Sequence, residues 1–172
     1  MECDMTKCVF LDRDGVINKD FEDYAYSLDR FIILDGVREA VRLLKDDGYL
    51  LIVVTNQAGI SKGIYTRFQM QACHDYMQAE LENRIDRIYY APWHPAHSES
   101  LSRKPGTLMF ERAIARFDID PSLSWMIGDR KTDIFAGRKM GLKTIQLGGK
   151  ADGNPDFVEV DLLAAANRIL EP

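Results

Sequence analysis

Short apolar runs alternate with helical periodicity along the whole chain, and this alternation restricts the fold more than any other feature. A run that is apolar at every position suits a strand whose two faces are both buried, as in a parallel sheet. The alternation therefore predicts a Rossmann-like α/β fold, with a mostly parallel sheet and helices on both faces. The predicted strands are residues 8–11, 50–54, 88–91, 125–127 and 144–147.

The stretches between the predicted strands carry apolar residues at helical spacing. We expect Gly48 to end the first helix and Asp161 to cap the last one. Two loops, residues 15–35 and 92–106, interrupt the alternation, and neither is large enough for a second domain. One domain over residues 1–172, without a large cap domain, is the prediction. The predicted helical faces are residues 37–44, 73–81, 110–117 and 162–169, with a further helix running through residue 140.

Composition excludes several classes of function. A net charge of −5 over 172 residues argues against sequence-independent binding of nucleic acid, which clustered Lys and Arg would support. Because no apolar run approaches the roughly 20 residues of a membrane span, we expect no membrane partner. The first residues lack the basic and apolar parts of a signal peptide, so a cytoplasmic location is expected. Cys8 and Cys73 fall on apolar faces and are predicted to be buried, reduced thiols.

Polar side chains follow the predicted strands where each strand ends. Asp12 and Asp14 come directly after the first strand, Thr55 follows the second, and Asp129 follows the fourth. Ligands bind outside the carboxyl ends of strands in open parallel sheets, so these groups are expected to meet at one edge. Lys104 precedes a predicted helix and is expected at the same edge. Carboxylates, a hydroxyl and an ammonium gathered in this way predict a catalytic or cation-binding site.

Each of these residues also has an ordinary structural interpretation. Thr55 and Asn56 could start a turn, and Lys104 could be a solvated loop residue. Asp133 could be the first-turn acid of the following helix or a member of the site, and both interpretations stay open. His94 and His97 lie in the loop of residues 92–106 without a matching set of metal ligands, so we interpret them as surface or substrate-contacting residues.

Four segments of the chain resemble the four ordered motifs of the haloacid dehalogenase (HAD) superfamily of phosphotransferases. The similarity extends from about residue 7 to about residue 150, and it is closer still to the subgroup that contains the heptose bisphosphate phosphatases and the histidinol-phosphate phosphatases. The four segments are Asp12-Arg13-Asp14-Gly15, Val54-Thr55-Asn56, Arg103-Lys104-Pro105 and Gly128-Asp129-Arg130 with Asp133.

This resemblance implies a role for each matching residue. Asp12 would attack phosphorus to form an aspartyl-phosphate, and Asp14 would act first as acid and then as base. Asp12, Asp129 and the main-chain oxygen of Asp14 would hold Mg²⁺, because hard oxygen ligands suit that ion. Thr55 and the amide of Asn56 would hydrogen-bond the phosphoryl oxygens. Lys104 would supply positive charge to the transferring group.

The resemblance also implies a substrate. It indicates a small phosphorylated sugar, most closely D-glycero-D-manno-heptose 1,7-bisphosphate, an intermediate of heptose biosynthesis for lipopolysaccharide precursors. Histidinol phosphate or another sugar phosphate is the nearest alternative, and the chain is expected to act as a monomer. The residues expected to contact the substrate are Asp20, Asp23, Thr55, Asn56, Gln57, Arg103 and Lys104.

One segment departs from the family pattern. Many heptose bisphosphate phosphatases bind a structural zinc through a C-x-H pair and a C-x-C pair before the motif that starts at Arg103. Here those segments read Ala91-Pro92-Trp93 and Ser100-Leu101-Ser102, so all four ligands are missing. We predict that zinc is absent and that packing of Trp93 helps to hold the loop.

A phospho-accepting receiver module is an alternative from another functional class. Receivers share the parallel sheet, an acidic magnesium site, a threonine and a lysine. Their acceptor aspartate, however, ends an internal strand near the middle of the fold, where this chain has Thr55. The position of the acidic pair after the first strand therefore favours an enzyme.

Overall fold

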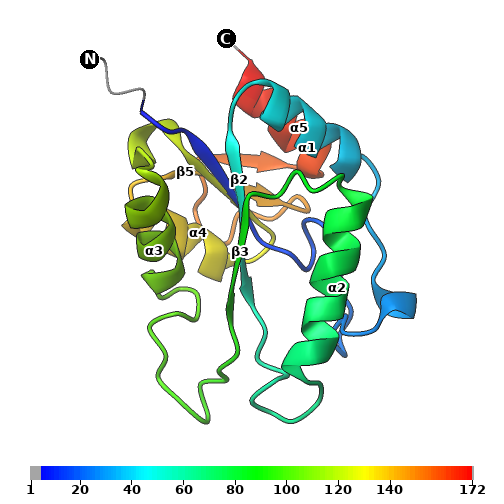
Figure 1. Cartoon of the computed structure of the whole chain (residues 1–172). Coiled ribbons are helices and arrows are strands. Elements are labelled where there is room, and N and C mark those ends of the chain that lie inside the picture. The colour runs from blue at the N-terminus through cyan, green and yellow to red at the C-terminus, as the bar shows by residue number, and fades with distance from the viewer. Residues whose placement is uncertain (1–4, 172) are drawn as a thin grey trace.

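A computed structural model describes residues 5–171 and contains a six-stranded sheet in which every neighbouring pair of strands is parallel (Figure 1). The strand order is β3-β2-β1-β4-β5-β6. This arrangement confirms the predicted Rossmann-like α/β fold. The strands are β1 (Cys8–Leu11), β2 (Leu50–Asn56), β3 (Arg87–Ala91), β4 (Trp125–Gly128), β5 (Lys143–Leu147) and β6 (Phe157–Glu159).

Five α-helices cover the two faces of the sheet, with α3 and α4 on one side and α1, α2 and α5 on the other (Figure 1). Two short 3₁₀ helices lie in the connections. The α-helices are α1 (Val37–Asp46), α2 (Arg67–Glu80), α3 (Leu108–Phe117), α4 (Lys131–Lys139) and α5 (Leu162–Leu170), and the 3₁₀ helices are η1 (Leu28–Arg30) and η2 (Pro121–Leu123).

Alternate residues of β1 belong to opposite halves of the core. Val9 and Leu11 pack with residues of α1, α2 and α5, whereas Cys8 and Phe10 pack with residues of α3 and α4. Successive side chains of a strand point to opposite faces, so burial on both sides favours the continuous apolar run that β1 has. Phe10 meets Phe110 of α3 with ring centroids 5.0 Å apart. The buried positions of Cys8 and Cys73 are confirmed, and both thiols are free.

The predicted helix ends at Gly48 and Asp161 are confirmed by their hydrogen bonds. Gly48 has φ of 84°, its N–H donates to Lys45 O, and the next N–H, of Tyr49, donates to Leu44 O. This pair of bonds is the Schellman motif, which satisfies the last carbonyls of α1. The side chain of Asp161 accepts from the N–H of Ala164 and caps α5.

Three elements differ from the prediction. Strand β2 continues through Asn56, so Thr55 and Asn56 lie in a strand and do not start a turn. Helix α2 begins six residues earlier than residue 73, because Thr66 and Gln69 form a capping box there. Strand β6 was not predicted. It is three residues long, its side chains are mostly exposed, and it joins the sheet edge through main-chain pairing with β5, so its apolar pair is too short to indicate a strand.

The amino-terminal ends of β1 and β4 are joined by a buried serine. Ser124 lies just before β4, and its Oγ accepts a hydrogen bond of 2.9 Å from the N–H of Cys8 in β1. The same hydroxyl donates to Asp120 O at 2.6 Å. At the opposite end of the two strands, the N–H of Asp12 donates to Ile127 O. These bonds hold the relative position of the two strands that lead into the functional site.

Helices in the described part of the chain, residues 5–171, are neither long nor apolar enough to cross a membrane.

Replacing Ser124 by alanine should lower the free energy of unfolding by about 1–3 kcal/mol, because the buried N–H of Cys8 would lose its acceptor. Chemical denaturation followed by circular dichroism measures the change. Ser122→Ala is the matched control, since Ser122 is exposed in the same segment and its loss should cost no more than about 0.5 kcal/mol. Equal stability of Ser124→Ala and wild type would contradict this role.

Candidate active site

The site lies where the strand order reverses direction. From β1 the chain continues outward to β2 and β3, whereas β4 returns to the other side of β1 and continues to β5 and β6. Open parallel sheets bind ligands at such a switch point, because the loops diverge there and leave a crevice. Asp12 follows β1 and Asp129 follows β4, so the topology itself brings these two residues together.

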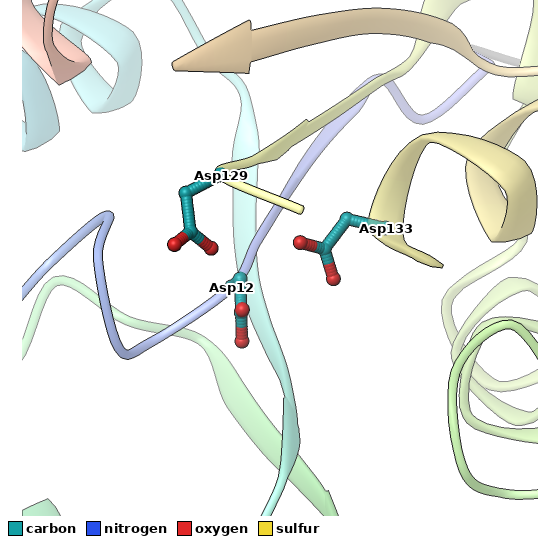
Figure 2. Close-up of side chains that lie close together, drawn as sticks. All are labelled: Asp12, Asp129 and Asp133. Atoms are coloured by element: carbon teal, nitrogen blue, oxygen red, sulfur yellow. The ribbon is translucent and has the colours of Figure 1, made fainter. Parts of the chain in front are cut away.

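Three carboxylates form the acidic cluster of Asp12, Asp129 and Asp133. One oxygen from each side chain can be chosen so that all three oxygens lie within 4.8 Å of one another. Figure 2 shows the three side chains converging from the end of β1, the end of β4 and the start of α4. Asp12 and Asp133 are buried.

The acidic cluster carries more negative charge than its surroundings neutralise. Burial raises the pKa of Asp12 to about 7; Lys104 opposes this rise, and Asp133, Asp129 and Asp14 add to it. Burial, followed by the charge of Asp133, raises the pKa of Asp129 to about 6. Oδ1 of Asp129 is buried and has no hydrogen-bond partner among residues 5–171. An orphaned carboxylate oxygen beside two other carboxylates fits a divalent cation.

Lys104 is the cation nearest to the cluster, and it is only 2% exposed. Its Nζ lies 2.9 Å from Oδ1 of Asp12, 2.7 Å from Oδ1 of Asp133 and 2.7 Å from the carbonyl oxygen of Val54. Burial disfavours the charged ammonium, but the two carboxylates outweigh it and raise the pKa of Lys104. The interpretation of Lys104 as a solvated loop residue is therefore wrong.

Asp133 has both of the roles that the sequence left open. Its Oδ2 accepts from the N–H of Arg130 at 3.1 Å and so caps the start of α4. Its Oδ1 contacts Lys104 within the acidic cluster. Gly128 allows this close approach, because a Cβ at Gly128 would lie 2.2 Å from the Cβ of Asp133. Asp133 was not among the predicted metal ligands, although its place in the first turn of α4 was a signal for it.

The carboxylate of Asp14 lies beside the acidic cluster and is held by its own donors. Oδ1 accepts from the guanidinium of Arg13 at 2.8 and 3.2 Å and from Nδ2 of Asn18 at 2.9 Å. Oδ2 accepts from Nε2 of Gln57 at 3.1 Å. Asp12 and Asp14 are thus close in sequence but differ in environment, and only Asp12 contacts Lys104.

Residues at the end of β2 hydrogen-bond to the residues of the site. Thr55 and Gln57 are fully buried, and Nε2 of Gln57 donates to Oγ1 of Thr55 at 2.8 Å. The side chain of Asn56 accepts from the N–H of Lys104 and donates to its carbonyl oxygen. The side chain of Gln57 also contacts Asp14 and Tyr65, and the substrate contact predicted for it stays a prediction.

A cleft of about 730 Å³ opens above Asp12, Asp14 and Lys104. The structure places Asp20 in its lining but not Asp23, because the turn that ends at Tyr24 directs Tyr24 to the cleft and leaves Asp23 exposed. His94 lines the cleft, whereas His97 is exposed outside it. The polar lining residues beyond the acidic cluster include Asp20, Glu22, Tyr24, Lys62, Arg103 and Arg130.

The loop of residues 92–103 is held by polar contacts. Oγ of Ser61 accepts from the N–H of His94 at 2.9 Å, and the hydroxyls of Ser100 and Ser102 are 2.7 Å apart. The expectation that packing of Trp93 helps to hold this loop stays a prediction, with 43% of the residue exposed. The carbonyl oxygen of Trp93 accepts from the guanidinium of Arg103 at 3.4 Å.

Known proteins resemble this chain in sequence and in fold. A family model described as HAD-hydrolase-like matches residues 101–164. A D-glycero-D-manno-heptose-1,7-bisphosphate 7-phosphatase of Chlorobaculum tepidum is 39% identical, with 81% of this chain and 77% of the relative covered. A D-glycero-beta-D-manno-heptose-1,7-bisphosphate 7-phosphatase of Haemophilus influenzae is 37% identical, with 97% and 98% covered.

A solved structure agrees with these relatives. The D,D-heptose 1,7-bisphosphate phosphatase from B. bronchiseptica, crystallised with magnesium and phosphate, has a TM-score of 0.86 at 28% identity and covers 96% of this chain and 98% of its own. A parallel sheet with buried carboxylates and a buried lysine at its switch point suits phosphoryl transfer, and the relatives identify the class as an enzyme. The chain belongs to the haloacid dehalogenase superfamily, among its phosphatases.

Asp12→Asn should stabilise the protein in the presence of a chelator. The pKa of Asp12 is about 7 in the folded state and about 4 in the unfolded state. Above about pH 7 the folded protein must hold a buried charge, which lowers its stability, whereas below about pH 4 Asp12 is neutral in both states and this loss disappears. The variant should therefore exceed wild type in free energy of unfolding by about 1 kcal/mol or more at pH 7.5, and by less at pH 5. Denaturant titrations at both pH values measure this difference.

The matched control is Asp75→Asn, which removes an exposed carboxylate from α2 and should change stability by no more than about 0.5 kcal/mol. Destabilisation by Asp12→Asn at pH 7.5 would show that the ion pair with Lys104 outweighs the burial of charge.

Proposed function

We propose that the protein is a Mg²⁺-dependent phosphatase whose substrate is D-glycero-D-manno-heptose 1,7-bisphosphate, hydrolysed at the 7-phosphate. The buried contact between Asp12 and Lys104 at the floor of the cleft carries this proposal. This contact supports the proposal, because the attack of an anion on a phosphate requires a fixed positive charge beside the attacking carboxylate. The names of the relatives support the choice of substrate.

The proposed reaction has two displacements at phosphorus. In the first, an oxygen of Asp12 forms a bond to phosphorus while the ester P–O bond breaks, and Asp14 gives a proton to the departing sugar oxygen. In the second, Asp14 takes a proton from water, the water oxygen attacks phosphorus, and the aspartyl-phosphate bond breaks to release phosphate. Oδ1 of Asp12 is engaged by the N–H of Arg13 and by Lys104, which orients the carboxylate for attack.

Asp12, Asp129 and the main-chain oxygen of Asp14 would hold the Mg²⁺ ion, with Asp133 beside them. The oxygen-only donor set and the orphaned Oδ1 of Asp129 fit this ion. When bound, Mg²⁺ neutralises the negative charge that gathers on the phosphoryl oxygens. Phosphatases of this superfamily use Mg²⁺, and the structure from B. bronchiseptica contains it.

The lining of the cleft supports a bisphosphate substrate. Lys62, Arg103 and Arg130 line the opening and offer positive charge beyond the reacting phosphate. The carboxylates of Glu22 and of Asp20, which is ion-paired with Arg130 at 2.6 Å, are acceptors for sugar hydroxyl groups. A cytoplasmic location, action as a monomer and a zinc-free loop of residues 92–103 complete the proposal.

A panel of phosphate esters tests this function. With Mg²⁺, kcat/KM for the heptose bisphosphate should exceed that for glucose 6-phosphate and for histidinol phosphate by about a hundredfold, since charge-assisted hydrogen bonds to a second phosphate contribute about 1.5–3 kcal/mol each. Phosphate release over time measures the rates. Asp12→Asn should release none from any ester, because the nucleophile is lost.

Faster turnover of histidinol phosphate would reassign the substrate while retaining the phosphatase. Phosphate release by Asp12→Asn at the wild-type rate would contradict the covalent route.

Gly15→Ala should weaken Mg²⁺ binding by about tenfold or more. A Cβ at this position would lie 2.4 Å from Oδ2 of Asp129 and would displace that ligand, and a displacement worth about 1.4 kcal/mol is already tenfold in affinity. Isothermal titration with MgCl₂ measures the dissociation constant.

Gly48→Ala is the matched control for backbone strain. Gly48 has φ of 84° against 83° for Gly15, yet its nearest neighbour would be Cε of Lys7 at 3.9 Å. Both variants should lose about 1–2 kcal/mol of stability from the left-handed conformation, but only Gly15→Ala should bind Mg²⁺ more weakly. Similar Mg²⁺ affinity of the two variants would contradict the assignment of Asp129.

A further inference from the structure

A buried histidine on α2 has no part in the reaction as described so far. His74 is 2% exposed, and its Nε2 lies 3.4 Å from Nη1 of Arg13. An arginine can only donate hydrogen bonds, so Nε2 of His74 must accept, which requires a neutral imidazole with its proton on Nδ1. Burial and the charge of Arg13 lower the pKa of His74 to about 3, in agreement with that state.

Arg13 is itself buried, with 1% of its surface exposed, and each of its contacts has a fixed direction. Nε and Nη2 donate to Oδ1 of Asp14, Nη2 also donates to Ala25 O at 2.9 Å, and Nη1 donates to His74. The guanidinium lies 5.3 Å from the centre of the Phe31 ring. A planar fork bound on three sides in this way has one orientation only.

The result of these contacts is that the two oxygens of Asp14 are no longer equivalent. Oδ1 accepts three N–H groups, two from Arg13 and one from Asn18, and has no room for a proton. Oδ2 accepts only one, from Gln57, and remains available to a ligand in the cleft. A proton carried by Asp14 must therefore sit on Oδ2.

We propose that His74 and Arg13 are positioning residues that hold Asp14 so that its Oδ2 faces the leaving-group oxygen of the substrate. His74 acts through Arg13 and touches neither the substrate nor the acidic cluster. The inference rests on the proposed function, because it concerns the acid–base step of that reaction. It assigns a catalytic consequence to a residue on α2, a helix that carries none of the groups in the acidic cluster.

Dependence on the leaving group separates a positioning role from a structural one. A sugar alkoxide must be protonated as it departs, whereas 4-nitrophenolate is a stable anion that leaves without a proton. The value of kcat/KM reports steps up to the cleavage of the ester bond, so it isolates this half-reaction. Loss of alignment should thus reduce kcat/KM for the sugar phosphate and spare that for 4-nitrophenyl phosphate.

The experiment compares His74→Leu, His74→Gln and wild type with Mg²⁺ on both esters. His74→Leu removes the acceptor and should lower kcat/KM at least tenfold for the best sugar phosphate of the panel, and less than twofold for 4-nitrophenyl phosphate. His74→Gln restores an acceptor, the amide oxygen, and should recover most of the loss. Arg13→Lys keeps the charge but loses the fork, and it should behave like His74→Leu.

Met77→Ala is the control for destabilisation, because Met77 is buried one turn further along α2 and belongs to the apolar core. It should lower stability and leave the ratio of the two kcat/KM values unchanged. Equal losses on both esters in His74→Leu and Arg13→Lys, or no loss on either, would overturn the inference. An inactive wild type on both esters would instead overturn the proposed function, so the two failures are distinguishable.

Discussion

Strand β1 lies between β2 and β4, is parallel to both, and is buried on both faces. Burial on both faces favours apolar side chains, and all four residues of β1 are apolar, so its first polar residue, Asp12, falls at the carboxyl edge. The adjacent β4 follows the same pattern, and Asp129 comes directly after it. The pairing of these two strands thus decides where the charges of the site are placed and how close they lie.

Gathering three carboxylates in a buried place is costly, and the protein offsets only part of that cost. Lys104 contributes one positive charge between Asp12 and Asp133. Its ammonium donates to the carbonyl oxygen of Val54, and its main-chain N–H donates to the side chain of Asn56. The remaining negative charge raises the pKa values of Asp12 and Asp129. Stability is therefore lost at the place where we propose that a cation and a phosphate bind, and a trade of stability for function is common at such sites.

The two aspartates that follow β1 are separated by their neighbours and not by their distance in the chain. Asp12 faces Lys104, whereas Asp14 is surrounded by the N–H groups of Arg13, Asn18 and Gln57. This difference supports the proposal that Asp12 attacks phosphorus and that Asp14 exchanges a proton. The donors to Asp14 come from the loop after β1 and from Gln57 just after β2, and His74 of α2 accepts from Arg13.

The spacing of apolar residues was sufficient to predict most of the fold, because each strand or helix has a periodicity that depends only on its own residues. The strands up to β5, the Gly48 and Asp161 caps and the meeting of Asp12 with Asp129 and Lys104 were all predictable in this way. Strand β6 was not, because its three residues contain too short an apolar run to indicate a strand. The depth of Asp23, Gln57 and Trp93 could not be predicted either, because the course of a loop and the depth of a side chain depend on distant contacts.

The sequence by itself determined the order of strands and helices along the chain, because burial on both faces favours particular residue types at each position. It also determined which carboxylates follow the central strands, and hence the class of chemistry. Only the tertiary structure decided which groups touch. Asp133 joined the cluster because α4 starts against it, and Lys104 was buried because its loop returns over β2. His74 reached Asp14 through Arg13 because α2 packs beside the loop that follows β1. Such contacts join residues tens of positions apart, and no local period records them.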